Sequence, residues 1–206
     1  MNKERNKNID SGAIKAATEV LKAGGVILYP TDTIWGIGCD ATNSEAVAKV
    51  LSIKHRTDSK SLIILVSDTD MLAKYVTKIP DIALDLIEIN DRPMTIIYPG
   101  AVVATQSSPA GSALAPNVVP EDGSIGIRIP NDPFCKALIS HFGRAIVSTS
   151  ANISGSKAPT NYESISGEIF KSVDWAADLS LESNPTGEAS QIIKVGLRGE
   201  IKVIRG

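Results

Sequence analysis

The stretch Leu62-Ile63-Ile64-Leu65-Val66 decides the fold class of this 206-residue chain. All five side chains are apolar, as expected of a strand that other elements cover on both faces. A helical pattern precedes the stretch, with a possible cap at Asn43 or Ser44 and apolar residues at Ala46, Val47, Val50, Leu51 and Ile53. A buried strand beside an amphipathic helix is typical of an α/β protein, in which helices cover a sheet.

Helices and strands alternate along the rest of the chain. Periodicity predicts further helices over Asp10 to Gly24, Asp68 to Tyr75, Asp81 to Ile89, Pro133 to Phe142 and Tyr162 to Phe170. It predicts strands over Val26 to Tyr29, Met94 to Tyr98, Ser124 to Ile129, Ala145 to Thr149, Trp175 to Leu179, Gln191 to Val195 and Ile201 to Ile204. Loops are expected over Pro30 to Asp40 and Ala101 to Asp122, and long loops often serve a site. This order predicts an α/β fold with a sheet of mixed strand direction.

Composition is that of a globular protein. Hydrophobic residues make up 43% of the chain and charged residues 21%, so we expect residues 1–206 to form one domain, with a flexible segment over 1–9. No apolar run approaches the roughly 20 residues that span a bilayer, and the first ten residues lack the apolar centre of a secretory signal. We therefore expect a soluble, cytoplasmic protein.

Cysteine and histidine give no sign of a disulfide framework or a zinc site. Cys39 and Cys135 are far apart without a CxxC spacing, and His55 and His141 form no pair at helical spacing. A resident transition metal is therefore not expected. A magnesium ion that enters with a nucleotide needs only one or two protein oxygens and is compatible with the sequence.

Three cations lie within seven residues at Lys54, Arg56 and Lys60. Because the net charge of the chain is -2, this cluster indicates a local anion site, with phosphate as the leading candidate. Lys54 also closes a predicted helix, where a cation can simply oppose the helix dipole. Residues two apart do not share a helix face, so Lys54 and Arg56 converge only if the helix ends between them, and Thr57-Asp58-Ser59 is turn-forming sequence.

Polar side chains follow the strand that ends near Thr149. Strand alternation places Ser148, Ser150 and Asn152 on one side of the backbone and Thr149 on the other. Turn chemistry at a strand end is the alternative, since Ser and Asn are common loop formers. Open α/β sheets bind ligands beyond the carboxyl ends of strands, which favours a binding role.

The segment Pro30-Thr31-Asp32-Thr33 also follows a strand, with a plain turn as the alternative. Residues 36–41, GIGCDA, formally fit the dinucleotide fingerprint G-x-G-x-x-A, but the loop from Pro30 separates them from their strand. No GxxxxGK[ST] occurs, which excludes a P-loop ATPase, and no GxSxG elbow supports a serine hydrolase. Arg128 lies within an otherwise apolar strand, and Arg205 ends the last strand. Each is either an edge residue or a ligand-facing cation.

Together these segments resemble the threonylcarbamoyl-AMP synthases, the YrdC-like family, from Gly24 to Gly206. Residues 25–38, GVILYPTDTIWGIG, look like the PTDTVYGLG signature of that family, and Lys54-His55-Arg56 resembles its KxR element. The remaining matches are Ser124 to Pro130 with a TVGVRVP strand, Ser148 to Asn152 with an SxSAN motif, and Ile204-Arg205-Gly206 with a closing arginine-glycine element.

The resemblance implies a twisted, open α/β sheet flanked by helices, whose concave face binds L-threonine, bicarbonate and ATP. The implied reaction yields threonylcarbamoyl-AMP and pyrophosphate with Mg²⁺, and a partner transferase then modifies tRNA. Carried over by position, Lys54, Arg56 and Lys60 would hold the phosphates and the threonine carboxylate. The other implied binding residues are Thr31 for threonine, Ser150 and Asn152 at the junction with the nucleotide, Ser148, Arg128 and Arg205 for ATP, and Ser190 in a late Ser-Thr element.

Two segments depart from the sequence that is usual in the family. Asn90-Asp91-Arg92-Pro93-Met94-Thr95 stands in place of WPGPLT, and Ser190-Gln191-Ile192 stands in place of STV. Such differences bear on substrate choice. The alternative class is a non-catalytic RNA-binding module that uses the same face, but the net charge of -2 and 4% aromatic residues argue against it.

Overall fold

The computed structural model describes residues 10–59 and 62–206. The expected flexible segment over 1–9 and the candidate residue Lys60 lie outside these residues. Within them, nine strands form one continuous sheet in the order β7-β1-β2-β6-β3-β5-β4-β8-β9. The strands are β1 Ile27–Tyr29, β2 Gly36–Gly38, β3 Ile63–Leu65, β4 Met94–Tyr98, β5 Ile125–Arg128, β6 Ile146–Ser150, β7 Trp175–Ala176, β8 Gln191–Val195 and β9 Ile201–Arg205.

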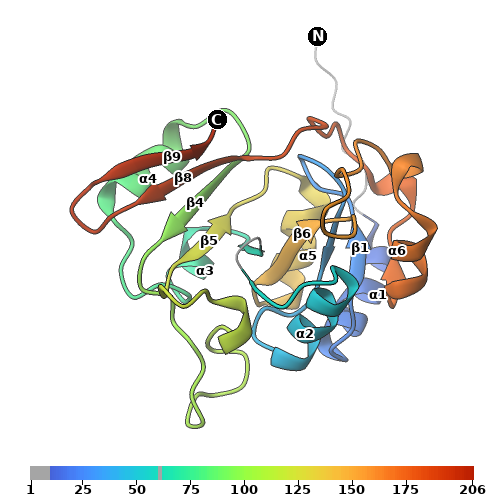
Figure 1. Cartoon of the computed structure of the whole chain (residues 1–206), viewed down its shortest axis with the longest axis horizontal. Coiled ribbons are helices and arrows are strands. Elements are labelled where there is room, and N and C mark those ends of the chain that lie inside the picture. Colours follow the sequence, from blue (N-terminus) through green and yellow to red (C-terminus); the bar gives the residue numbers. More distant parts are fainter. Residues whose placement is uncertain (1–9, 60–61) are drawn as a thin grey trace.

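The sheet contains both parallel and antiparallel pairs, as the mixed strand direction expected from the sequence requires. The pairs β3–β5, β4–β8 and β1–β7 are parallel, whereas β1–β2, β2–β6, β3–β6, β4–β5 and β8–β9 are antiparallel. The sheet is twisted and unclosed, and Figure 1 shows the β8–β9 hairpin projecting at one end, with the chain terminus beside it. The α/β prediction with a mixed, open sheet is confirmed.

Helices flank the sheet and supply most of the apolar cover. The α-helices are α1 Ser11–Lys22, α2 Ser44–Ile53, α3 Thr69–Leu72, α4 Asp81–Ile89, α5 Pro133–Phe142 and α6 Gly167–Ser172. Helices α1 and α5 pack against each other, and Figure 1 shows α2 in the foreground near the bottom of the view. Side-chain caps begin them where the sequence suggests, since Asp10 accepts the N–H groups of Gly12 and Ala13, and Asn43 those of Glu45 and Ala46.

The prediction of a loop throughout Pro30 to Asp40 is wrong, because β2 lies within it. Gly36–Gly38 pairs with β1 on one side and β6 on the other. The two glycines allow this, since a Cβ at Gly38 would collide with the carbonyl oxygen of Val147 and lie 2.9 Å from the Tyr29 ring. They form a strand interior and not the turn before a helix, which removes the dinucleotide fingerprint as an interpretation.

Two predicted helices are shorter than expected. After α3 the chain leaves the helix because the carbonyl oxygen of Tyr75 accepts the N–H of Val102, which begins a sheet-like contact with a distant segment. The helix expected over Tyr162 to Phe170 is two elements, a 3₁₀ turn at Tyr162–Ser164 and then α6. Ser166 restarts the second element by accepting the N–H of Ile169.

The strand expected over Trp175 to Leu179 contains only two residues. Trp175 and Ala176 pair with β1 at the edge of the sheet. Asp178 then accepts the N–H of Ser180 and begins a 3₁₀ turn, Leu179–Leu181. Between β4 and β5, the irregular segment that we expected over Ala101 to Asp122 contains a further 3₁₀ turn, Pro116–Val118.

Strand alternation gives the centre of the sheet two different faces. On β4 and β5, Thr95 and Arg128 face one cavity, while Ile96 and Ile127 face another. We call these the front cavity, of about 490 Å³, and the back cavity, of about 860 Å³. The front cavity collects the polar motifs of the sequence.

Candidate functional site

The front cavity brings together residues from distant parts of the chain. It is lined by strands β2 to β6 near the centre of the sheet, by the end of α2, and by the ends of β8 and β9. The predicted site residues that line it are Thr31, Lys54, Arg56, Arg128, Ser148, Ser150, Asn152, Ser190 and Arg205. Lys60 is outside the described residues, so its position stays a prediction.

The end of α2 explains how Lys54 and Arg56 reach the same cavity. The helix stops at Ile53, and the N–H groups of His55 and Arg56 then donate to the carbonyl oxygens of Ser52 and Leu51, at 2.9 Å each. This pair of bonds is a Schellman motif, which needs a left-handed residue at the turn. His55 takes that conformation with φ of 52°. The helix therefore ends between the two cations, as their convergence requires.

Lys54 ties the end of α2 to the turn that follows β6. Its Nζ donates to the carbonyl oxygen of Ser150 at 2.6 Å, to the carbonyl oxygen of Asn152, and to Asn152 Oδ1 at 3.2 Å. Ser150 Oγ also lies 2.5 Å from Asn152 Oδ1 and donates to it. Burial, together with the positive charge of Arg56, lowers the pKa of Lys54 to about 8. The lysine thus organises the predicted Ser-Ala-Asn segment.

Arg128 anchors the loop that follows β1. Its Nη1 donates to Thr33 Oγ1 at 2.8 Å and lies 3.5 Å from Asp32 Oδ1. Thr33 Oγ1 is in turn 2.7 Å from Thr31 Oγ1, which donates to the carbonyl oxygen of Ile34 at the same distance. Arg128 is a buried, cavity-facing residue of an interior strand and not an edge residue.

Arg205 closes the cavity from the edge strand β9. Its Nε and Nη2 donate to the carbonyl oxygen of Ser190, at 2.9 and 2.6 Å. Ser190 Oγ and Thr95 Oγ1 form a buried hydrogen bond of 2.8 Å beneath it. Burial, and the nearby charge of Arg128, lower the pKa of Arg205. The two guanidinium groups therefore repel each other until an anion lies between them.

The described lining of the front cavity contains the cations Lys54, Arg56, Arg128 and Arg205 and no Asp or Glu. Many of its other polar groups are hydroxyls. Fixed positive charge without carboxylates in a concave site selects an anionic ligand and excludes a metal site built from protein carboxylates. Over the described residues, no group of three or more His, Cys, Asp or Glu is placed to hold a metal ion.

Some lining residues were not among the predicted site residues. Thr33 and Thr95 contribute hydroxyls that hold Arg128 and Ser190, and Trp35 donates through Nε1 to Glu182 at 2.7 Å. A hydroxyl inside the apolar strand Met94–Tyr98 was the available signal for Thr95. Thr149, expected on the opposite side from Ser148, also contributes to the cavity wall.

Two residues that depart from the family pattern lie away from this cavity. Arg92 lines the back cavity, and Gln191 is absent from the described lining of either cavity. An effect of Gln191 on substrate choice stays a prediction. Ser190, its neighbour, keeps its hydroxyl in the wall of the front cavity.

Comparison with known sequences shows which protein family this chain resembles. Residues 19–206 match the Sua5/YciO/YrdC family, which carries the description "telomere recombination". The chain belongs to this family. The expected resemblance to YrdC-like proteins is confirmed. In residues 10–59 and 62–206, no helix has the length and apolar character needed to cross a membrane.

Relatives and solved structures of the Sua5/YciO/YrdC family agree with this assignment. Threonylcarbamoyl-AMP synthase of Pseudoalteromonas translucida is 33% identical over 200 residues, covering 96% of this chain and 99% of that protein. The enzyme of the same name from Stenotrophomonas maltophilia is 33% identical over 167 residues, or 80% and 85% of the two chains.

The fold is also that of solved family members. E. coli YciO superposes with a TM-score of 0.69 at 25% identity, covering 93% of this chain and 87% of that one. P. abyssi Sua5, solved in complex with L-threonine, gives a TM-score of 0.72 at 23% identity over 88% of this chain. This chain spans about half of that Sua5 chain, 50%.

Proposed function

We propose that this protein is an L-threonylcarbamoyladenylate synthase, a nucleotidyltransferase. It would use L-threonine, bicarbonate and ATP to form threonylcarbamoyl-AMP and pyrophosphate. The observation that carries the proposal is the front cavity, where four cations and no described carboxylate surround a space for anions. The names of relatives that match nearly the full chain support the same activity.

We assign roles by position in the cavity. Arg56, Arg128 and Arg205 would neutralise the phosphates of ATP, with Lys60 as a further candidate. Lys54 would act mainly by holding the Ser-Ala-Asn turn, because its ammonium group already donates to Ser150 and Asn152. The remaining proposed contacts are Thr31 with threonine, Ser150 and Asn152 at the junction of threonine and nucleotide, and Ser148 and Ser190 with ATP.

The proposed chemistry needs positioning and charge more than a strong base. The threonine amine condenses with bicarbonate, losing water, to give a carbamate. An oxygen of the carbamate attacks the α-phosphorus, the bond from that phosphorus to the bridging oxygen breaks, and pyrophosphate leaves with the electron pair. Because all partners are anionic, fixed guanidinium groups in a cavity lower their mutual repulsion and stabilise the transition state.

We expect Mg²⁺ to enter with the nucleotide. The described lining offers hydroxyl and amide oxygens but no carboxylate, so the protein side fits an ion that is held mainly by phosphate oxygens and water. When bound, the ion would neutralise part of the phosphate charge. The protein residues would orient the phosphates around it.

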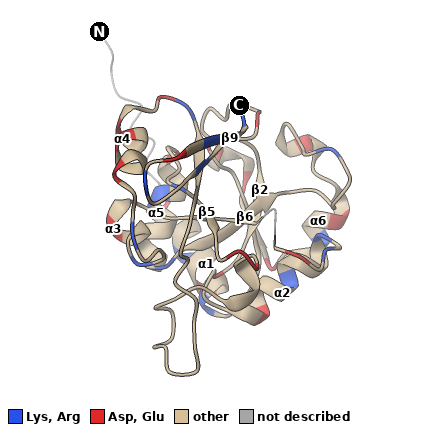
Figure 2. Cartoon of the chain, turned by 60° about the vertical axis from the view of Figure 1, so that its left-hand side comes forward, with Lys and Arg blue, Asp and Glu red and all other residues tan. Residues whose placement is uncertain are grey.

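The product would pass to a transferase that modifies adenosine in tRNA, in the cytoplasm. Direct tRNA binding would be weak or absent. The alternative, a non-catalytic RNA-binding module, requires a basic surface, and Figure 2 shows acidic and basic residues interspersed around the described part of the chain. Steep salt dependence of binding to bare tRNA would favour that alternative.

The deciding experiment measures pyrophosphate release from ATP with bicarbonate and threonine, serine or no amino acid. We expect threonine-dependent release. Arg56→Ala should lower kcat/KM by about 100-fold, the usual effect of losing one charged transition-state donor. Lys22→Ala, on the exposed surface of α1, is the matched loss of a cation away from the cavity and should leave the rate unchanged. A folded protein without threonine-dependent release would refute the proposal.

A further inference from the structure

The back cavity shares no described lining residue with the front cavity. Its floor is the other face of the central strands, where Met94, Ile96 and Ile127 lie, and its walls include Ile87 of α4 and Phe134 of α5. At about 860 Å³ it falls within the usual range for small-molecule sites, about 300 to 1,000 Å³. An apolar floor with polar groups at its margin is the common composition of such sites.

Tyr98 adds a polar group to this apolar floor. Its side chain is fully buried and lines the cavity. Burial raises the pKa of the phenol well above its usual value, so the group stays protonated. A buried hydroxyl is normally paired, because an unmade hydrogen bond costs free energy. Because Tyr98 lines the cavity, its phenol can offer a hydrogen bond to a molecule bound there.

Asp32 gives the cavity its charge. The side chain is 12% exposed, its Oδ2 accepts the N–H of Asn131 at 2.8 Å, and its Oδ1 accepts no hydrogen bond from the described residues. The nearby carboxyl of Asp132 has a raised pKa, mainly from burial and also from the charge of Asp32. The effect of Asp32 on Asp132 shows that two carboxyl groups lie close together at this end of the cavity.

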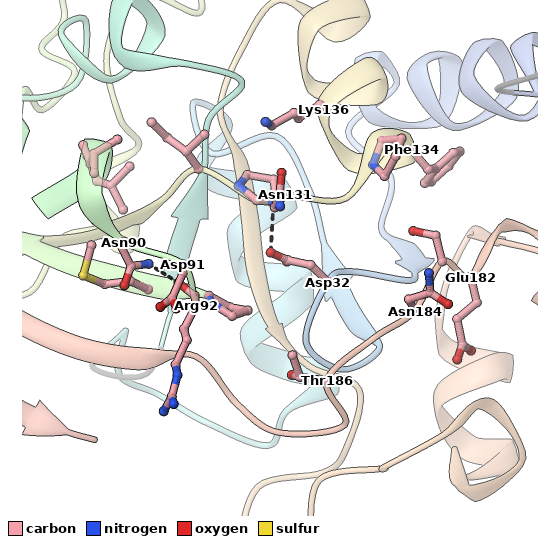
Figure 3. Close-up of a pocket in the computed structure, with 18 of the residues that line it drawn as sticks. Asp32, Asn90, Asp91, Arg92, Asn131, Phe134, Lys136, Glu182, Asn184 and Thr186 are labelled. Carbon is pink, nitrogen blue, oxygen red and sulfur yellow. Dashed lines mark hydrogen bonds between the residues drawn. The ribbon is translucent and has the colours of Figure 1, made fainter. Parts of the chain in front are cut away.

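The charged side chains of the margin are arranged to favour a cation. Figure 3 shows Asp32 in the middle of the lining, between Asp91 on one side and Glu182 on the other. The guanidinium of Arg92 points away from Asp32 in Figure 3. The described lining contains two cations, Arg92 and Lys136, and four carboxylates, Asp10, Asp32, Asp91 and Glu182. An ammonium group beside Asp32 would therefore meet more negative than positive charge.

We propose that the back cavity binds an organic amine with an apolar body, whose ammonium group pairs with Asp32 and whose body covers the floor beside Tyr98. The site is separate from the proposed ATP site. Asp32 links the back cavity to the front cavity. Its Oδ1 lies 3.5 Å from Nη1 of Arg128, and Arg128 lines the front cavity. The bound amine shares this carboxylate with Arg128.

The test is calorimetric titration of the full chain, without ATP, with two probes of nearly the same shape. Tryptamine carries an ammonium group on an indole body, and indole-3-propionate carries a carboxylate. We expect tryptamine to bind at least tenfold more tightly. Asp32→Asn keeps an acceptor for Asn131 and should remove this difference between the probes.

The position of the probe is tested on α4. Ile87→Trp fills the cavity and should abolish tryptamine binding, whereas Leu84→Trp, on the exposed side of the same helix, should not change it. Equal affinity for the two probes, or tryptamine binding that survives both Ile87→Trp and Asp32→Asn in folded proteins, overturns the proposal. Because no turnover is measured, these outcomes do not depend on the proposed synthase activity.

Discussion

The N–H of Arg56 donates to the carbonyl oxygen of Leu51 across the end of α2, at 2.9 Å. This bond turns the chain so that two cations separated by one residue line the same cavity. The residue between them, His55, adopts φ of 52°, which costs an ordinary L-residue roughly 1 to 2 kcal/mol and glycine very little. The anion site therefore depends on one unfavourable backbone conformation.

We predict opposite effects for two substitutions at this position. His55→Gly should stabilise the protein by up to about 1 kcal/mol, because glycine adopts the left-handed conformation readily. His55→Val should destabilise it by about 1 to 2 kcal/mol and weaken ATP binding, because a β-branched residue resists that conformation. Urea unfolding measures the first quantity and calorimetry the second. Equal stability of the two variants would show that the turn is not strained.

The His55 side chain is a minor factor in this comparison. Its Nε2 lies 3.9 Å from Glu168 Oε1, and both side chains are more than half exposed, at 64% and 59%. Exposed ion pairs of this kind contribute little. His55→Ala serves as the control. It removes the contact with Glu168, but it lacks both the ease of glycine and the resistance of valine toward the left-handed conformation.

Lys54 should give ATP binding a pH dependence. Burial and Arg56 lower its pKa to about 8, so the ammonium loses its charge as the pH rises through 8. Below that pH the ammonium is charged, so it holds the Ser-Ala-Asn turn more strongly and adds positive potential to the cavity that binds the phosphates. We therefore expect the affinity for ATP to fall between pH 7 and 9 in the natural protein.

The control for this prediction is Lys54→Arg, whose guanidinium stays charged throughout that range. Its affinity for ATP should be independent of pH between 7 and 9, even if the absolute value is lower. A pH profile that is identical in the two proteins would assign the titration to another group. Because bound phosphate raises the pKa of Lys54, ATP binding is measured at ATP concentrations below saturation.

Gly38 should not tolerate a side chain. A Cβ at this position would collide with the carbonyl oxygen of Val147 and lie 3.0 Å from Ile146 Cγ2, at the end of β2 beside β6. We expect Gly38→Ala to destabilise the fold by about 3 kcal/mol or more, the upper range for overpacking. Gly167→Ala, at the start of α6 with open space around the new methyl group, should change stability by less than about 0.5 kcal/mol. Thermal unfolding compares them directly.

The sequence predicted the elements that carry a clear period and clear ends. The observed bounds of α4, α5, β4 and β8 agree with the expected ones. Helix α5 ends at Gly143, where φ is 78°, so the stop signal is local and readable. Strand β2 was missed because Gly-Ile-Gly has no apolar alternation, and its role follows from close contact with a strand more than a hundred residues away.

The front cavity could be predicted in part, because its motifs lie at the ends of strands that the sequence marks clearly. The polar motifs follow strand ends, and the sheet brings those ends together at one cavity. The sequence did not indicate that Lys54 would be held by Ser150 and Asn152, because that contact joins two motifs through side-chain reach. The back cavity was not predicted either, since its walls come from segments that are far apart in the chain and carry no shared motif.

The pair Asp32 and Arg128 tests how strongly the two cavities are connected. Arg128→Met leaves the buried carboxylate of Asp32 without its cation, and breaking such a pair from one side costs about 3 kcal/mol. Asp32→Asn should cost less, because Arg128 keeps its hydrogen bond to Thr33. The double variant removes both charges, so we expect it to be more stable than Arg128→Met alone. Urea unfolding of the four proteins measures the coupling. A double variant that simply sums the two losses would show that Asp32 and Arg128 act independently and that the carboxylate is already satisfied from the back cavity.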